Sequence, residues 1–220
     1  MTWAGLGLAT SLCATLEREG FTTPSPIQAK AIAPQLEGHD LLGLAETGSG
    51  KTAAFLLPIL QMLRDFDRRP APKTVRALIL VPTRELAVQI EESARRLAGG
   101  ARLSTLLVLG GTSRSAQIRA LSRGVDIVIA TPGRLTDLMQ AGHVRFDETR
   151  TLVLDEADRM LDMGFVRPVQ AIAATLHRRR RTALFSATMP AEVEALAAGL
   201  MTEPVRVEVA RSGQTVQRIE

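Results

Sequence analysis

The stretch that most constrains this chain is residues 45–52, which read Ala-Glu-Thr-Gly-Ser-Gly-Lys-Thr. The mostly apolar residues 40–44 before it are expected to form a short buried strand, and the apolar residues from Ala53 to open a helix. A glycine-rich turn that joins a strand to a helix and ends in Lys-Thr is typical of a phosphate-binding loop. The backbone N–H groups of such a loop point at phosphate oxygens near the positive end of the helix. The stretch therefore predicts a site for a nucleoside triphosphate.

Single residues of this loop have separate expected tasks. Gly48 and Gly50 allow positive φ and a close approach of the backbone to an anion. Lys51 would reach the outer phosphates, and the Thr52 hydroxyl would ligate Mg²⁺. Ala45 stands where the general pattern has glycine, so a plain turn between a strand and a helix is the alternative.

Length, composition and charge restrict the class of protein that contains this loop. A chain of 220 residues can bury one sizeable core, and no apolar run approaches the length of a membrane span. The N-terminus lacks the basic and apolar regions of a secretory signal, and Cys13 is the single cysteine, so a cytoplasmic protein is expected. The net charge of +4 permits nucleic-acid binding, whereas 3% aromatic residues make base stacking an improbable main mode of RNA contact.

Apolar runs alternate with helix-forming segments along the rest of the chain. Strands are expected at residues 77–81, 103–109, 125–130, 151–154, 182–185 and 205–209. Helices are expected at residues 8–19 and 26–36, after residues 82–87 as far as about residue 97, and from about residues 53, 113 and 190. Near-continuous apolar strands that alternate with helices predict an α/β fold whose mainly parallel sheet is covered by helices on both faces.

Polar clusters follow the carboxyl ends of the expected strands, the edge where open α/β sheets bind ligands. Asp155 ends one strand and could hold Mg²⁺, while Glu156 could orient or activate an attacking water. Asp158 is expected to hydrogen-bond elsewhere, with Ser186 and Thr188 as its natural hydroxyl partners. A solvated loop is the alternative for an isolated Asp-Glu pair.

Taken together, seven segments resemble, in order, the motifs of the amino-terminal RecA-like domain of DEAD-box RNA helicases. These segments are residues 20–28, 45–52, 82–87, 110–111, 131–134, 155–158 and 186–188. The family commonly has alanine at the position of Ala45, and in detail the chain is similar to the bacterial RhlE-like branch. The resemblance implies one RecA-like domain over residues 1–208, with an adenine-recognising Q-motif region in residues 1–38. Residues 209–220 would start a linker to a second RecA-like domain.

The resemblance also implies roles for residues of an ATP site. Phe21 would stack on adenine, Gln28 would hydrogen-bond the adenine edge, and Thr23 would contribute a backbone contact to the base. Trp3 stands where the family usually has an isolated upstream phenylalanine. The implied phosphate cradle is Thr47, Gly48, Ser49, Gly50, Lys51 and Thr52. The implied catalytic residues are Lys51, Asp155, Glu156, Asp158, Ser186 and Thr188, with Mg²⁺ held through Thr52 and Asp155.

RNA contacts are implied in the same way and are consistent with the chemistry of the residues. Backbone amides, hydroxyls and arginines grip phosphates without reading bases. The residues implied are Pro82, Thr83, Arg84, Gly111, Thr131, Gly133 and Arg134. The basic run at residues 177–181 lies before a strand, away from these motifs, and is expected to be a solvated loop.

The function implied is that of an ATP-dependent RNA helicase that unwinds short duplexes. The family's second domain carries arginines that complete the ATP site, so these 220 residues alone are expected to bind nucleotide as a monomer with little hydrolysis. A non-catalytic module that binds nucleotide and RNA is one alternative. A second alternative is a lobe of a DNA-acting superfamily 2 translocase. Gln28 and the sequence Asp-Glu-Ala-Asp at residues 155–158 disfavour it.

Overall fold

The most apolar segments of the chain become the centre of a sheet, because neither of their faces meets water. Every residue of β2 (Val75–Leu80) and β5 (Thr151–Leu154) is buried, as is every residue of β6 (Arg181–Ser186) after its first. The edge strand β3 (Thr105–Val108) and the opposite edge strand β7 (Val205–Glu208) are more exposed. The remaining strands are β1 (Leu41–Leu44) and β4 (Val125–Ala130).

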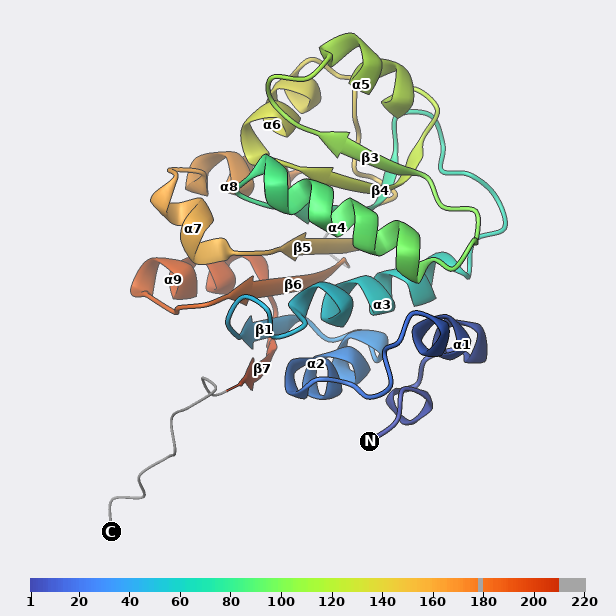
Figure 1. The fold of residues 1–220 in the computed structure, drawn as a ribbon. Coiled ribbons are helices and arrows are strands. Elements are labelled where there is room, and N and C mark those ends of the chain that lie inside the picture. Colours follow the sequence, from blue (N-terminus) through green and yellow to red (C-terminus); the bar gives the residue numbers. More distant parts are fainter. Residues whose placement is uncertain (178–179, 210–220) are drawn as a thin grey trace.

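The computed structural model describes residues 1–177 and 180–209, and its seven strands form one sheet (Figure 1). The strand order is β3-β4-β2-β5-β6-β1-β7, and all neighbouring strands run parallel. The predicted α/β fold with a mainly parallel sheet is confirmed. Because the strands are parallel, their carboxyl ends share one edge of the sheet.

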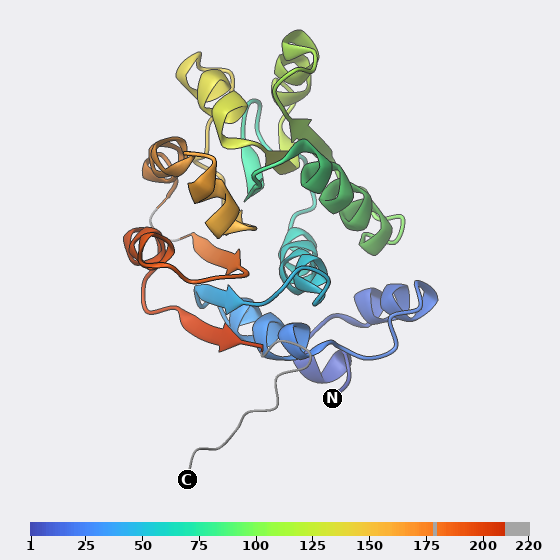
Figure 2. The ribbon, with the colours of Figure 1, turned by 60° about the vertical axis from the view of Figure 1, so that its left-hand side comes forward.

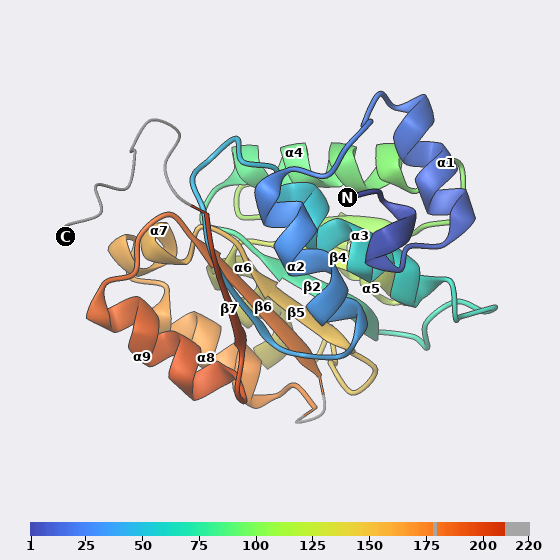
Figure 3. The same ribbon diagram turned by 90° about the horizontal axis from the view of Figure 1, so that it is seen from below.

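Helices cover both faces of the sheet, since alternate residues of each strand point to opposite sides. Along β2, Leu78 belongs to one apolar cluster and Ile79 to the other. The cluster around Ile79 includes residues of α1 to α4, and the cluster around Leu78 includes residues of α5 to α9. Figure 2 and Figure 3 show these two layers with the sheet between them.

The helices include one short 3-10 turn, η1 (Ala4–Leu6). The first layer consists of α1 (Thr10–Arg18), α2 (Pro26–Leu36), α3 (Lys51–Leu63) and α4 (Arg84–Leu97). The second consists of α5 (Arg114–Leu121), α6 (Pro132–Gln140), α7 (Ala157–Asp162), α8 (Val166–Ala174) and α9 (Ala191–Leu200). None of the described helices is both long and apolar enough to cross a membrane.

Most expected boundaries are close to those observed. The bounds of α2, β4 and β5 agree with those expected from the sequence. Strand β2 starts at Val75, two residues before the expected start, because the chain is already buried there. Sequence periodicity missed α6, α7 and α8, which are short. At the expected linker, Val209 still donates a hydrogen bond to the Leu44 carbonyl, 3.0 Å, beside β7, and residues 210–220 lie outside the described part of the chain.

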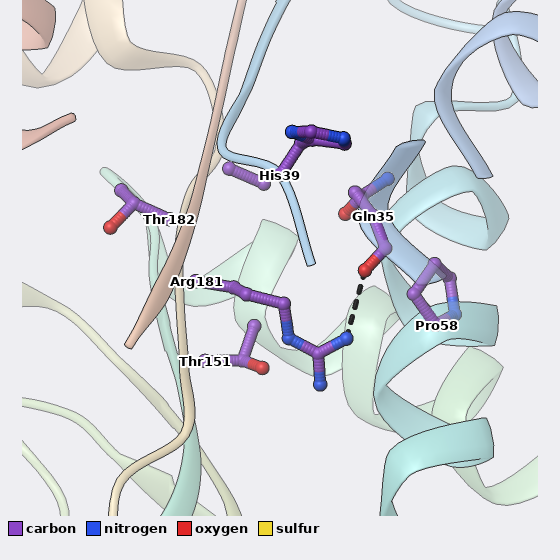
Figure 4. Close-up of a pocket in the computed structure, with 7 residues that line it drawn as sticks. Gln35, His39, Pro58, Thr151, Arg181 and Thr182 are labelled. Carbon is purple, nitrogen blue, oxygen red and sulfur yellow. Dashed lines mark hydrogen bonds between the residues drawn. The ribbon is translucent and has the colours of Figure 1, made fainter. Parts of the chain in front are cut away.

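The expectation of a solvated loop at residues 177–181 is wrong for Arg180 and Arg181. The Arg181 guanidinium donates to the Gln35 carbonyl at 2.8 Å, and Arg180 donates to the Leu200 carbonyl at 3.4 Å. Burial lowers the pKa of both side chains. Figure 4 shows Arg181 in a small cavity at the amino-terminal edge of the sheet, beside Thr182. These two arginines are therefore structural, and residues 178 and 179 lie outside the described part of the chain.

Candidate functional site

The strand order divides the predicted site residues into two neighbouring groups on the carboxyl edge. One group follows the adjacent strands β5, β6 and β1: residues 155–158, 186–188 and 45–52. The other follows the adjacent strands β3, β4 and β2: residues 110–111, 131–134 and 82–84. The residues expected to act on nucleotide thus lie together, beside those expected to contact RNA.

The phosphate-binding loop has the backbone conformation that its glycines predict. Gly48 and Gly50 have φ of 84° and 96°, and α3 begins directly afterwards at Lys51. The Lys51 Nζ atom is buried without a hydrogen-bond partner and lies 3.9 Å from Asp155 Oδ1. A buried ammonium group is costly unless an anion pairs with it closely. The loop therefore fits an anionic phosphate group next to Lys51.

Gln28 is buried and connects α2 to this loop. Its Oε1 accepts a hydrogen bond from the Ser25 N–H at 2.8 Å, and its Nε2 donates to the Gly50 carbonyl at 3.1 Å. The Ser25 hydroxyl donates to the Ser49 carbonyl at 2.8 Å. A primary amide has two N–H donors and two acceptor lone pairs, so Gln28 keeps one of each for the edge of a base. Its contact with Gly50 was not foreseen from the sequence, because it joins residues of two separate elements.

Two aromatic residues connect the N-terminal turn to the segment that is predicted to meet adenine. Trp3 is buried, and its Nε1 donates to the Phe21 carbonyl at 2.9 Å, which ties the N-terminal turn to the segment before α2. The guanidinium carbon of Arg96 lies 5.2 Å from the centroid of the Phe21 ring. Stacking on adenine would use the ring face that Arg96 leaves open. Thr23 is exposed, and its role stays a prediction together with that of Phe21.

Asp155 and Glu156 occupy an unusual environment at the end of β5. Asp155 is 2% exposed, and burial raises its pKa to about 6, although Lys51 and the Glu156 N–H, 2.9 Å from Oδ1, act in the opposite direction. Glu156 adopts left-handed backbone angles, φ 54° and ψ 51°, a conformation that costs a residue with a side chain energy and is typical of functional sites. Its carboxylate pairs with Arg159 at 3.3 Å. Arg159 was not predicted, because sequence periodicity did not reveal α7, the helix that carries it.

Asp158 makes the hydroxyl contacts that the sequence predicted. Its Oδ2 accepts from the Thr188 hydroxyl at 2.8 Å and from the Thr188 N–H at 3.0 Å, while its own N–H donates to Ser186 Oγ at 3.2 Å. Burial raises the pKa of Asp158, but the hydrogen bonds outweigh burial and the net pKa is lowered. The segments at the ends of β5 and β6 are therefore joined by three hydrogen bonds, one between side chains and two between a backbone N–H and a side chain.

The predicted metal ligands consist of two oxygen donors. Thr52 is half-buried and Asp155 buried. Mg²⁺ is commonly held by one or two protein oxygens together with substrate phosphates and water, and Thr52 and Asp155 fit that pattern. Within residues 1–177 and 180–209, no three His, Cys, Asp or Glu side chains form a group that could hold a metal ion.

The predicted RNA residues form bridges between neighbouring loops. Arg84 donates to the Gly110 carbonyl at 3.0 Å, and Arg134 donates to the Thr112 carbonyl and to Gln117 Oε1, both at 3.2 Å. Buried Gln117 in turn bonds to the Thr112 hydroxyl. Thr112 and Gln117 were not predicted, because neither lies in a recognisable motif. These hydrogen bonds hold the guanidinium groups of Arg84 and Arg134 in fixed positions at the carboxyl edge.

The remaining predicted RNA residues are held mainly by their backbones. Gly111 has φ 72°, and a Cβ atom there would lie 2.8 Å from Arg84 Nη1. Thr83 caps α4 by accepting from the Leu86 N–H at 3.3 Å. Pro82 is buried, and its role stays a prediction. The structure leaves Thr131 and Gly133 half-buried at the start of α6, where their roles stay predictions.

Comparison with known proteins agrees with this geometry. The sequence pattern of the DEAD/DEAH box helicase family matches residues 25–196. A crystal structure of a DEAD box protein from the hyperthermophile Methanococcus jannaschii superimposes with a TM-score of 0.86 at 34% identity, covering 94% of this chain and 56% of that one.

Two curated relatives are similar over the whole chain. The probable ATP-dependent RNA helicase ddx27 of Dictyostelium discoideum is 45% identical over 222 residues, which cover 100% of this chain and 28% of the relative. The DEAD-box ATP-dependent RNA helicase CshA of Streptococcus pneumoniae is 41% identical over 220 residues, which cover 100% of this chain and 41% of the relative. The chain therefore spans less than half the length of these two relatives.

Proposed function

The chain belongs to the DEAD/DEAH box helicase family, and we propose that it forms the ATP-binding, RNA-contacting lobe of an ATP-dependent RNA helicase that separates short RNA duplexes. The observation that carries this proposal is the buried Lys51 ammonium, which has no hydrogen-bond partner and lies 3.9 Å from Asp155, on the same sheet edge as Arg84 and Arg134. The names of the two relatives support RNA as the substrate. The RhlE-like branch, a cytoplasmic location and a monomeric lobe belong to the same proposal.

In this proposal each residue of the ATP site does a separate task. Backbone N–H groups of the loop bind the phosphates, and Lys51 neutralises their outer charge. Thr52 and Asp155 would hold Mg²⁺, which would further neutralise the phosphates. Glu156 orients the attacking water once its carboxylate leaves Arg159, which lies 3.3 Å away. Asp158 couples this site to the segment of Ser186 and Thr188 through the hydrogen bonds described above.

Hydrolysis is expected to need a second RecA-like lobe. An arginine supplied from outside the site contributes roughly 10³–10⁵ in rate, or about 4–7 kcal/mol of barrier. Arg84 and Arg134, which belong to the other group of strands, are bonded to neighbouring loops. The 220-residue chain would therefore bind nucleotide with turnover near background.

The test compares RNA-stimulated ATP turnover by this chain and by the same chain joined to a second RecA-like domain. The proposal expects Mg-ATP binding by both proteins and turnover only by the joined one. Robust turnover by the chain alone would contradict the proposal that hydrolysis needs a second RecA-like lobe. Absence of turnover by both, with binding intact, would favour a non-catalytic module, and equal stimulation by DNA and RNA would favour a DNA translocase because 2′-hydroxyl contacts distinguish RNA.

A further inference from the structure

A basic groove lies at the amino ends of β2, β3 and β4, on the edge of the sheet opposite to the nucleotide and RNA residues. It has a volume of about 580 Å³ and is lined by the connection between α3 and β2 and by the residues around Ser104. A smaller hollow of about 200 Å³ shares Leu63, Phe66, Arg102 and Leu103 with it. We call the two together the arginine groove.

A buried ion pair holds the floor of the arginine groove in place. Arg76 is 4% exposed and donates to Asp126 Oδ1 at 2.9 Å and to the Arg68 carbonyl at 2.6 Å. Its guanidinium carbon lies 4.0 Å from the centroid of the Phe66 ring. Asp126 Oδ2 accepts from the Ser104 N–H at 3.0 Å and from the Ser104 hydroxyl at 2.6 Å. The connection between α3 and β2 and the segment around Ser104 are therefore joined through one network. Because the groove is already ordered, binding a partner costs less conformational entropy.

The rim of the arginine groove carries more positive than negative charge. Four exposed arginines line it, and within the described residues none of them forms an ion pair: Arg64, Arg68, Arg69 and Arg102. Asp67 is the acidic lining residue that the Arg76 network does not use. The carboxyl ends of α3 and α4 add about half a negative charge each. About two positive charges remain after these offsets, so the groove attracts an anionic partner.

The smaller hollow adds an apolar surface to this charge. Its lining includes Leu12, Leu60, Leu63, Ala98 and Leu103, with Arg64 and Arg102 at the same site. An apolar side chain of a protein gains free energy by covering such a surface, whereas a ribose-phosphate backbone does not. The expected RNA residues lie on the other edge of the sheet. The combination favours a peptide over a nucleic acid.

We propose that the arginine groove docks an acidic segment of a partner protein. The segment places a leucine- or phenylalanine-sized side chain against Leu63 and Leu103, and its carboxylates meet Arg64, Arg68 and Arg102. Because the groove and the nucleotide residues lie on opposite edges of the sheet, a partner bound there leaves the nucleotide edge open.

The test is selection of peptides from a random displayed library on the immobilised 220-residue chain, followed by fluorescence anisotropy with the peptide most enriched. The proposal expects enriched sequences that combine Asp or Glu with Leu or Phe, and affinity that falls with salt. The double variant Arg68→Glu with Arg102→Glu should weaken binding about tenfold or more. Arg68 serves the Arg76 network through its backbone carbonyl, so this substitution leaves that bond in place.

The matched control is Arg119→Glu with Arg167→Glu, which makes the same charge change at exposed arginines outside the groove and should leave peptide affinity unchanged. Replacing the Leu and Phe residues of the peptide by Ser should weaken binding about tenfold. Enrichment of neutral or basic sequences, or equal losses in the two double variants, overturns the proposal. Displacement of the peptide by a single-stranded RNA together with no effect of the Ser replacements also overturns it, because the groove would then be a nucleic-acid surface.

Discussion

Gln28 shows how one residue can serve two parts of a site. The resemblance to the helicase family assigned it to the adenine edge, and the structure adds its bonds to the Ser25 N–H and to the Gly50 carbonyl. Removing its side chain therefore alters the base site and the phosphate loop together. The loss of affinity for a nucleotide with a different base, such as GDP, measures only the contribution that Gln28 makes through the phosphate loop.

Gln28→Ala should weaken ADP binding by about tenfold or more and reduce the free energy of unfolding by about 1–3 kcal/mol, because buried backbone groups lose their partners. Isothermal titration with ADP and GDP and urea unfolding measure both effects. The matched control is Gln35→Ala in the same helix: Gln35 bonds to the Ala31 and Ala54 carbonyls, so stability should fall while ADP affinity stays. Equal losses for ADP and GDP in Gln28→Ala would mean that Gln28 does not read adenine.

Asp155 and Asp158, two of the three carboxylates in residues 155–158 after β5, have pKa values displaced in opposite directions. Burial raises the pKa of Asp155 from 3.8 to about 6, so the folded chain holds this proton longer than the unfolded chain. The stability linked to Asp155 is therefore present at low pH and is lost as pH rises through about 6. Asp158 has a lowered pKa, so its contribution is present above pH 3.8 and is lost at lower pH.

The variant Asp155→Asn tests this difference in the nucleotide-free, Mg²⁺-free chain. The free energy of unfolding of the wild type minus that of the variant should fall by up to about 3 kcal/mol between about pH 4 and about pH 7. Only the slope of the difference is used, since loss of the charge beside Lys51 shifts its absolute level. Asp158→Asn should give a flat or slightly rising difference over the same range. A flat result for Asp155→Asn would show that Asp155 titrates near its ordinary pKa.

At the scale of elements, the contact between β1 and β6 holds the phosphate loop in place. Gly43 pairs with Phe185 in the register of the two strands, and the Ala45 N–H donates to the Ser186 carbonyl at 3.0 Å. The Phe185 ring is fully buried and packs against Phe55, with their centroids 5.6 Å apart. A Cβ atom on Gly43 would lie 2.6 Å from the Phe185 ring. Glycine is therefore required here for space.

Gly43→Ala should lower the free energy of unfolding by about 1–3 kcal/mol, because the overpacked ring cannot leave the core without strain. Urea unfolding measures the change. The same substitution at Gly199 in α9, where a Cβ atom would meet nothing within 4 Å, should raise stability by up to about 1 kcal/mol. An unchanged midpoint for Gly43→Ala would show that β1 and β6 can move apart.

At the scale of the whole molecule, the two edges of the sheet carry different sets of residues. The carboxyl edge brings together the nucleotide group and the arginines expected to contact RNA, and the amino edge carries the arginine groove. Arg84 and Arg134 are hydrogen-bonded to loops that follow neighbouring strands. Replacing either arginine therefore removes a contact between loops of the carboxyl edge as well as a positive charge.

Arg84→Ala and Arg134→Ala should each weaken the binding of single-stranded RNA and reduce the slope of log affinity against log salt by about 0.7. Anisotropy titrations over a salt series give both values. Arg119→Ala, a loss of the same charge at an exposed site on α5, should leave the slope unchanged. Equal effects of all three substitutions would mean that RNA binds through overall charge. Urea unfolding of each variant separates a lost RNA contact from a disturbed loop.

Much of the fold follows from features that lie close together in the chain. The apolar strands, the glycines of the phosphate loop and the polar residues after each strand are local patterns, and they predicted the α/β class and the position of the site. The pairing of Asp158 with Ser186 and Thr188 was also predicted, since each follows the end of a buried strand. The partial burial of Arg180 and Arg181 was missed because their carbonyl partners, Leu200 and Gln35, are far away in the sequence.

The sequence by itself determined which segments are strands and where the phosphate loop lies, because hydrophobic periodicity and turn chemistry act over a few residues. The base-side residues Phe21, Thr23 and Gln28 were implied only by the resemblance to the helicase family. Tertiary structure alone decided that β5 and β6 lie next to β1, that Gln28 contacts Gly50, and that the walls of the arginine groove meet through Arg76. These are contacts between distant parts of the chain. They depend on how the two helical layers pack onto the sheet, which no short stretch of sequence specifies.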